Sequence, residues 1–301
     1  MSEPRTTPDA LSRGGELREW LAGAEGLVLG LDFDGTLAPI VEDHTEATLT
    51  TESRAALDRL AERPGVALAL VSGRALDDLT GRVEVEGAVY AGNHGLELEH
   101  GGERTVHPDV EGLAPEVDRL CAELDERLGD VPGYAVENKR VTATVHYRNV
   151  PGGRVPHVVE TVEAVVDEAD GLRVSEGKEI RELRPAVDWD KGRVMDLLVE
   201  ASPGDWRAMY VGDDTTDEDA FRAIQPDGVG VHVAPDGDED DTGDITDAAY
   251  RLDGQAAVPR LLEWLDVNAP RPDATPDGAW PGDGPLSLSR VADARGTGPR
   301  S

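Results

Sequence analysis

Lysine and cysteine are both scarce in this 301-residue chain. Cys121 is the only cysteine, so neither an intrachain disulfide nor a cysteine-rich zinc site can form, and a reducing compartment fits. Of the 29 basic residues only Lys139, Lys178 and Lys191 are lysines, and the others are arginines. Because an ammonium and a guanidinium are not interchangeable, each retained lysine indicates a position with a particular geometric demand.

Long apolar segments are missing as well. The N-terminal stretch MSEPRTTPDALSRGG contains no apolar run of signal-peptide length, and no later run reaches the ~20 apolar residues that span a bilayer. We therefore expect a cytoplasmic protein that does not associate with membranes. No obligate protein partner is evident.

Negative charge outnumbers positive charge by more than two to one. Against 29 Lys and Arg stand 62 Asp and Glu, which gives a formal charge of −33 and disfavours nucleic acid and anionic membranes as partners. Such a surface resembles that of a halophile's protein, because in molar salt the Debye length falls to about 3 Å and self-repulsion is screened. A disordered acidic protein is the alternative, but the regular apolar periodicity of the chain argues against it.

Apolar runs alternate with amphipathic segments along most of the chain, in which 39% of residues are hydrophobic. This alternation predicts an α/β fold with a doubly wound, Rossmann-like parallel sheet. The expected strands are 26–31, 66–71, 88–91, 206–211 and 229–233, and the expected helices are 15–23, 53–63, 191–200, 216–223 and 255–265.

The middle of the chain breaks this rhythm. Residues 108–186 read as helix, two strands, helix and two strands, which predicts a small α+β cap domain inserted into a core formed by 1–107 and 187–267. Residues 268–301 are rich in Pro, Gly, Asp and Ser, and we expect a disordered tail.

Two aspartates follow the first expected strand directly. Asp32 and Asp34 are spaced i, i+2 and lie at the carboxyl end of the sheet, where open α/β sheets bind ligands, and Gly35 permits a sharp turn. The spacing aims both carboxylates the same way, so that one can attack phosphorus while the other handles protons. Asp-x-Asp pairs also recur by chance in so acidic a chain, and their ordinary interpretation is solvated surface.

Three further groups fall on strand ends or helix starts. Ser72 and Arg74 follow the second strand, where a hydroxyl and backbone N–H groups suit phosphoryl oxygens, although Ser72 also suits a plain helix N-cap. Lys191 begins a helix and has an ammonium that balances the charge of Asp32 and a phosphate. Residues 212–219 (GDDTTDED) supply hard oxygen ligands of the kind that Mg²⁺ takes, and they depart from the spacing of a calcium loop.

Together these four signals resemble the haloacid dehalogenase superfamily of phosphotransferases. The resemblance implies that Asp32 is the nucleophile, Asp34 the general acid/base and Ser72 the phosphate-binding hydroxyl, with Lys191 stabilising charge. It also implies a Mg²⁺ ion held by Asp32, the backbone carbonyl of Asp34 and Asp213. The metal candidates nearby are Asp214 and Asp217.

A longer set of motifs is similar to the trehalose-6-phosphate phosphatases. The matching stretches are 31–39 (LDFDGTLAP), 71–74 (VSGR), 92–97 (GNHGLE), 137–139 (ENK), 146–148 (HYR), 177–178 (GK), 182–185 (ELRP), 190–192 (DKG) and 212–221 (GDDTTDEDAF). Phe33 stands where a Tyr is more usual, and Arg181 interrupts a stretch that is usually more apolar. The resemblance implies a substrate-binding set of Arg74, Asn93, His94, Glu137, Lys139, His146, Arg148, Lys178 and Glu182.

These features predict a Mg²⁺-dependent phosphatase that hydrolyses trehalose 6-phosphate, a small sugar phosphate, through an aspartyl-phosphate on Asp32. One alternative is a phosphatase of the same superfamily that acts on another sugar phosphate, such as sucrose 6-phosphate. Another is a catalytically silent sugar-phosphate sensor, which the complete set of Asp32, Asp34, Lys191 and Asp213 disfavours. Two of the predicted substrate-binding residues also have a purely structural interpretation. In that interpretation His94 is a turn residue and His146 is a packed strand residue.

Overall fold

The computed structural model describes residues 7–41, 46–177, 179–235 and 246–271. These divide into two compact units, one formed by the chain up to Thr105 and again from Trp189, the other by Val106–Asp188. Lys178, the acidic run 236–241 and the expected tail beyond residue 271 lie outside the described residues. Among the described helices, none combines the length and the apolar character needed to cross a bilayer.

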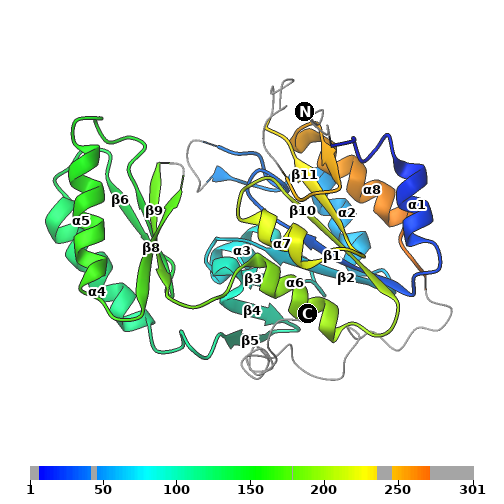
Figure 1. Cartoon of the computed structure of the whole chain (residues 1–301), viewed down its shortest axis with the longest axis horizontal. Helices are drawn as coiled ribbons and strands as arrows, with labels where there is room; N and C mark the ends of the chain where they lie inside the picture. Colours follow the sequence, from blue (N-terminus) through cyan, green and yellow to red (C-terminus); the bar gives the residue numbers. More distant parts are fainter. Residues whose placement is uncertain (1–6, 42–45, 178, 236–245, 272–301) are drawn as a thin grey trace, which may run out of the picture. The chain divides into compact units, whose positions relative to one another are not determined.

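The first unit is built on an eight-stranded sheet in the order β12-β11-β10-β1-β2-β3-β4-β5 (Figure 1). Neighbouring strands from β12 to β3 run parallel, and β4 pairs with β3 in the antiparallel sense. The strands are β1 (Gly26–Leu31), β2 (Val66–Val71), β3 (Val89–Gly92), β4 (Glu97–His100), β5 (Glu103–Val106), β10 (Trp206–Gly212), β11 (Val229–Val233) and β12 (Tyr250–Leu252).

Helices cover both faces of this sheet. The first strand is buried throughout, as its uninterrupted apolar run predicts. Leu27, Leu29 and Leu31 share a core cluster with residues of α1 (Gly14–Leu21), α2 (Thr51–Ala61), α3 (Leu76–Val83) and α8 (Val258–Asn268). On the other face a side chain at Gly30 would collide with Met195 of α6 (Lys191–Ala201), which packs against α7 (Asp217–Ala223). The predicted doubly wound fold is therefore confirmed.

The structure adds elements that the apolar pattern did not reveal. These are α3, β4, β5 and β12. Glu97–His100 and Glu103–Val106 carry charged residues on half-exposed strands, and Tyr250–Leu252 has only three residues, so none presents an apolar run. The eight residues of α3 place Leu76, Leu79 and Val83 on one buried face, too short a pattern to separate from a loop.

The second unit is a four-stranded sheet packed against two helices. The sheet order is β6-β7-β9-β8, and neighbouring strands pair in the antiparallel sense. Its elements are α4 (Ala114–Leu128), β6 (Ala135–Asn138), β7 (Ala143–His146), α5 (Val155–Asp167), β8 (Leu172–Gly177) and β9 (Ile180–Pro185). Ala143, Val145 and Leu183 join the apolar residues of both helices in one core. By the two-residue period of a strand, Thr144, His146 and Glu182 occupy the opposite face.

Candidate active site

The carboxyl ends of four adjacent parallel strands bring together predicted catalytic, metal-binding and substrate-binding residues of the first unit. Asp32 follows β1, Ser72 follows β2, Asn93 follows β3 and Asp213 follows β10. These strands are neighbours in the order β10-β1-β2-β3, so residues from distant parts of the chain meet at one edge of the sheet. This is the edge at which open α/β sheets bind ligands.

A buried ion-pair network lies at this edge. Nζ of Lys191 donates hydrogen bonds to Oδ1 of Asp32 and to Oδ1 of Asp217, each at 2.7 Å. Lys191 is 3% exposed, Asp32 is 5% exposed and Asp217 is fully buried. The position of Lys191 is set by the start of α6, where the Asp190 side chain caps the helix by accepting from the Arg193 N–H.

Asp217 is the most heavily hydrogen-bonded carboxylate of the site. Its Oδ1 accepts from Lys191 and, at 2.8 Å, from the Tyr210 hydroxyl. Its Oδ2 accepts from the backbone N–H groups of Asp213 and Asp214 at 3.1 and 2.9 Å. Asp217 therefore fixes both the ammonium and the turn that carries Asp213. Tyr210 was missed by sequence reasoning, although a hydroxyl within the buried half of β10 was the available signal.

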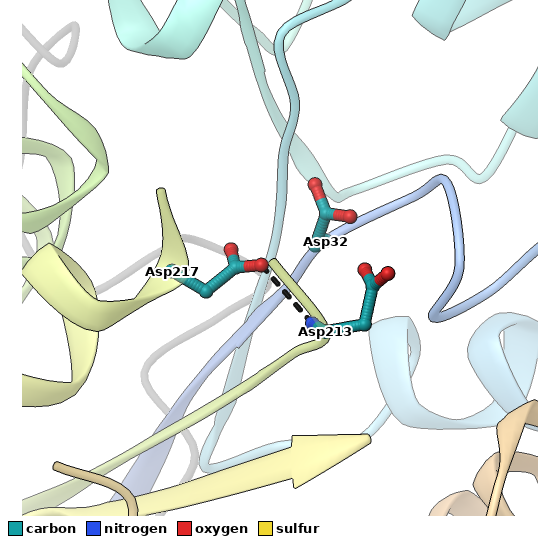
Figure 2. Close-up of side chains that lie close together, drawn as sticks. All are labelled: Asp32, Asp213 and Asp217. Atoms are coloured by element: carbon teal, nitrogen blue, oxygen red, sulfur yellow. Dashed lines mark hydrogen bonds between the residues drawn. The ribbon is translucent and has the colours of Figure 1, made fainter. Parts of the chain in front are cut away.

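Three carboxylates form a group with the spacing of a metal site (Figure 2). One oxygen each from Asp32, Asp213 and Asp217 lie within 4.8 Å of one another. When all three carboxylates are ionised, they and the one ammonium leave an excess of two negative charges, which a divalent cation would neutralise. Among the other predicted metal candidates, the exposed Asp214 is not in this group, and its Oδ1 accepts from Thr215. Asp34 was predicted to offer its backbone carbonyl, and its side chain contacts Arg74 instead of joining the group.

The buried charges shift one another's titration. Burial raises the pKa of Asp32 well above its ordinary value, with Lys191 opposing and the carboxylates of Asp217 and Asp213 adding to the rise. Burial and the Asp217 charge raise the pKa of Asp213 to about 7. Burial alone would lower the pKa of Lys191, but Asp217 and Asp32 outweigh it and raise that pKa. The ammonium thus stays charged.

The turn after β1 has no room for a side chain. Gly35 adopts φ +80°, and a Cβ there would lie 2.0 Å from Oδ2 of Asp213. The hydroxyl of Thr36 donates to Oδ1 of Asp213 at 3.4 Å. The glycine predicted to permit a sharp turn therefore also lets the backbone of this turn approach the Asp213 carboxylate closely.

Asp34 and Arg74 form a two-point ion pair. Nε of Arg74 donates to Oδ2 of Asp34 at 2.7 Å, and Nη2 donates to Oδ1 at 2.6 Å. Asp32 instead contacts Lys191, so the two carboxylates engage different cations. The two-residue spacing did not anticipate this, because Asp34 lies past the end of β1 and strand periodicity no longer governs its side chain.

Ser72 and the Asn93–Gly95 turn are joined through the backbone. Asn93 N–H donates to the carbonyl of Arg74 and His94 N–H to the carbonyl of Ser72, at 2.7 and 2.8 Å. Asn93 and His94 both have positive φ, at 51° and 57°, a costly conformation that persists where surroundings enforce it. Helix α3 begins at Leu76 with Ala75 as its N-cap, so Ser72 is not a helix cap.

The second unit brings four of its predicted substrate-binding residues together on one sheet face. Nζ of Lys139 lies 3.9 Å from carboxylate oxygens of both Glu137 and Glu182. His146 Nε2 lies 3.3 Å from Oε2 of Glu137. Thr144, which was not predicted, stands between Glu137 and Glu182 in the strand register and is buried.

Arg148 stands apart from this group within the second unit. It follows β7 and donates from Nε to Glu179 at 2.9 Å in an exposed pair. Such surface pairs contribute little to stability. The role of Arg148 on the substrate stays a prediction.

Comparison with known proteins identifies a matching family model. The model of the trehalose-phosphatase family matches residues 30–255. Trehalose-phosphate phosphatase from Mycobacterium marinum is 42% identical over 234 residues, which cover 75% of this chain and 58% of the relative. The Mycobacterium tuberculosis protein of the same name is 40% identical over 264 residues, which cover 86% and 65%. The chain thus spans about three fifths of the length of these curated relatives.

Solved structures share the fold at lower identity. A trehalose-6-phosphate phosphatase related protein has a TM-score of 0.70 at 21% identity and covers 80% of this chain and 97% of its own. The C-terminal domain of C. albicans trehalose-6-phosphate phosphatase has a TM-score of 0.69 at 22% identity, with coverages of 87% and 98%. A haloacid dehalogenase-like hydrolase from Bacteroides thetaiotaomicron reaches 0.52 at 16% identity, covering 79% and 98%.

The hydroxyl of Tyr210 should contribute measurably to stability through Asp217. Tyr210→Phe removes one donor to a buried charge, so we expect the free energy of unfolding to fall by about 1.5 kcal/mol. The edge-to-face contact of this ring with Phe221, at 5.8 Å, stays in place. Tyr250→Phe is the matched control, because its hydroxyl makes a 3.3 Å bond to exposed Glu16, and a change under about 0.5 kcal/mol is expected. Equal losses in urea unfolding would contradict the role given to Asp217.

Proposed function

Because the chain belongs to the trehalose-phosphatase family, we propose that it hydrolyses trehalose 6-phosphate to trehalose and inorganic phosphate. Family membership confirms the resemblance predicted from the motifs. The observation that best supports this activity is the buried contact between Lys191 and Asp32, beside Asp213. Burying so much charge is costly, and a carboxylate held by an ammonium at a ligand-binding sheet edge suits a nucleophile.

The nucleophilic step uses Asp32. An oxygen of its carboxylate attacks phosphorus, the bond from phosphorus to the sugar oxygen breaks, and an aspartyl-phosphate forms. Lys191 holds one carboxylate oxygen of Asp32 at 2.7 Å, which fixes the side chain before the substrate arrives. The same ammonium offsets the negative charge that the phosphoryl group brings to the buried site.

Proton transfer falls to Asp34. As an acid it gives a proton to the departing sugar oxygen, and as a carboxylate it then takes one from water. That water attacks the acyl phosphate, the bond from phosphorus to Asp32 breaks, and inorganic phosphate leaves. Asp34 is suited to this exchange because its side chain is 42% exposed, whereas Asp32 is buried.

The acidic residues fit a Mg²⁺ ion. The close spacing of their oxygens and the excess of two negative charges match a hard divalent cation. Asp32 and Asp213 would hold it together with the predicted backbone carbonyl of Asp34, while Asp217, whose oxygens accept four hydrogen bonds, would orient the others. When bound, Mg²⁺ neutralises charge on the transferring phosphoryl group.

Phosphate recognition falls to Ser72, and sugar recognition to the second unit. The Ser72 hydroxyl stands at the strand edge beside Gly73, where backbone N–H groups suit phosphoryl oxygens. In the second unit Glu137, Lys139 and Glu182 present alternating charges on one sheet face, which suits the hydroxyl groups of a disaccharide. We assign that unit the role of a cap that selects the sugar, in a cytoplasmic enzyme that works in high salt.

The nucleophile and the substrate can be tested together. Purified protein in molar salt with Mg²⁺ should release phosphate from trehalose 6-phosphate faster than from sucrose 6-phosphate or glucose 6-phosphate. Asp32→Asn should lower turnover by at least about 10³-fold, because the group that forms the covalent intermediate is lost. Arg104→Gln, which removes two surface ion pairs of the same unit, with Asp77 and Glu99, is the control and should keep wild-type turnover.

The outcomes of this assay separate the alternatives. Preference for a different sugar phosphate would refute the trehalose assignment and leave the phosphatase chemistry standing. Binding of a sugar phosphate without any release of phosphate would identify a sensor. Wild-type turnover by Asp32→Asn would show that Asp32 is not the nucleophile.

The metal site predicts a pH dependence with a definite sign. The pKa of Asp213 is about 7 when folded against an ordinary value of 3.8, so the metal-free folded state binds more protons between about pH 4 and 7. Its contribution to stability is therefore lost as pH rises through that window. Mg²⁺ competes with the bound proton, so stabilisation by Mg²⁺ should grow over the same range.

Urea unfolding at about pH 5, 6, 7 and 8, with EDTA or with Mg²⁺, measures this effect. Asp213→Asn should remove most of the increase in Mg²⁺ stabilisation, and Asp196→Asn, a half-buried carboxylate of α6, should leave it unchanged. A Mg²⁺ effect of equal size at pH 5 and pH 8 would contradict the assignment of Asp213 as a metal ligand.

A further inference from the structure

The two-point pair of Arg74 and Asp34 gives the proposed acid/base its orientation. Two parallel N–H to oxygen bonds, at 2.7 and 2.6 Å, fix the plane of the carboxylate as well as its position. A single bond would leave that plane free to rotate. Each Asp34 oxygen still has a second lone pair, so the contact leaves room for a proton.

Arg74 is itself held rigidly. It is 6% exposed, its Nη1 donates to Oδ2 of Asp78 at 2.7 Å, and its guanidinium lies 5.2 Å from the ring centre of the buried Phe33. Asp78 in turn accepts from Nε of Arg82 at 2.8 Å, and Arg82 donates to the carbonyl of Ala47. A chain of alternating charges therefore runs from Arg82 through Asp78 and Arg74 to the carboxylate of Asp34.

Asp34 depends on this chain for its orientation. Its side chain is 42% exposed, so packing alone does not fix its rotamer, whereas the Arg74 side chain is 7% exposed. Proton transfer requires the carboxylate to be held within about 0.5 Å and 10–20° of its productive geometry. The rigid partner is therefore the arginine, and the group that must be placed is the aspartate.

We propose that Arg74 is a positioning residue that acts through Asp34, holding its carboxylate where it exchanges protons with the sugar oxygen and with water. This inference rests on the proposed function and replaces the expected contact of Arg74 with the substrate. All three guanidinium nitrogens donate to carboxylates of Asp34 and Asp78, which is the arrangement of a support for a neighbouring side chain.

The variants that test this leave no buried charge without a partner. In Arg74→Gln, Asp78 keeps both of its contacts with Nε of Arg82, and Asp34 remains accessible to water. Arg74→Lys keeps the charge but loses the planar fork, so it should not restore the orientation of Asp34. Circular dichroism and urea unfolding of each variant establish that it is folded, with Arg104→Gln again as the control.

A double-mutant cycle on turnover is the decisive measurement, with whichever sugar phosphate the wild-type protein hydrolyses. Arg74→Gln should lower kcat by about 10²-fold, with KM within about threefold, because general acid–base catalysis contributes about 10²–10⁴-fold. In the Asp34→Asn background the same change should cost less than about threefold, since its effect passes through Asp34. Arg74→Lys should resemble Arg74→Gln.

Equal losses in both backgrounds, or a raised KM with unchanged kcat, would overturn the inference and make Arg74 a phosphate ligand. A second measurement is independent of turnover. In crystals of Arg74→Gln the Asp34 carboxylate should leave its position or occupy more than one rotamer, and a single unchanged rotamer would also overturn the inference. Failure of the wild type to hydrolyse any sugar phosphate would refute the proposed function, with the crystal result still deciding the role of Arg74.

Discussion

The contact of Lys191 with Asp32 and Asp217 is the interaction on which the rest of the site depends. Removing each charge from water costs several kcal/mol, so a buried network persists only where nearly every donor and acceptor has a partner. Asp217 meets this condition with four hydrogen bonds, from Lys191, Tyr210 and two backbone N–H groups. The network ties together the end of β1, the starts of α6 and α7, and strand β10.

Close backbone approach is the second constraint, and glycine satisfies it. A Cβ at Gly212 would lie 2.2 Å from Cγ of Asp217, and one at Gly35 would lie 2.0 Å from Asp213. Gly212 is the last residue of β10, and Gly35 lies in the turn after β1. The concentration of negative charge therefore requires a local backbone without side chains, in addition to the buried ammonium that offsets part of that charge.

Much of the arrangement of the site could be predicted from the sequence, and the contacts that could not be predicted have a physical reason. The apolar run before Asp32 indicated a buried strand, and parallel topology then placed Ser72 and Asp213 at the same edge. The pairing of Asp34 with Arg74 depends on the side-by-side placement of β1 and β2 and on rotamers beyond the strand end. No spacing rule encodes those distances.

The different roles of the aspartates in the acidic cluster could not be predicted from the sequence either. Three aspartates of one acidic run cannot be told apart by residue type. In the structure Asp214 is exposed, Asp213 lies beside Gly35, and Asp217 accepts four hydrogen bonds. Burial and donor count distinguish them. In the second unit the strand register likewise revealed Thr144 between two predicted glutamates, a neighbour that only the pairing of β7 with β6 and β9 could identify.

The central claim is that Asp32 forms a covalent intermediate, and trapping that intermediate tests it most directly. The protein would be mixed with trehalose 6-phosphate and Mg²⁺ for less than one turnover, quenched in acid, digested and mapped by mass spectrometry. The account predicts a phosphoryl group on the peptide that contains Asp32, released by hydroxylamine as an acyl phosphate is. Phosphorylation of a different residue, or rapid turnover with no phosphorylated peptide, would contradict it.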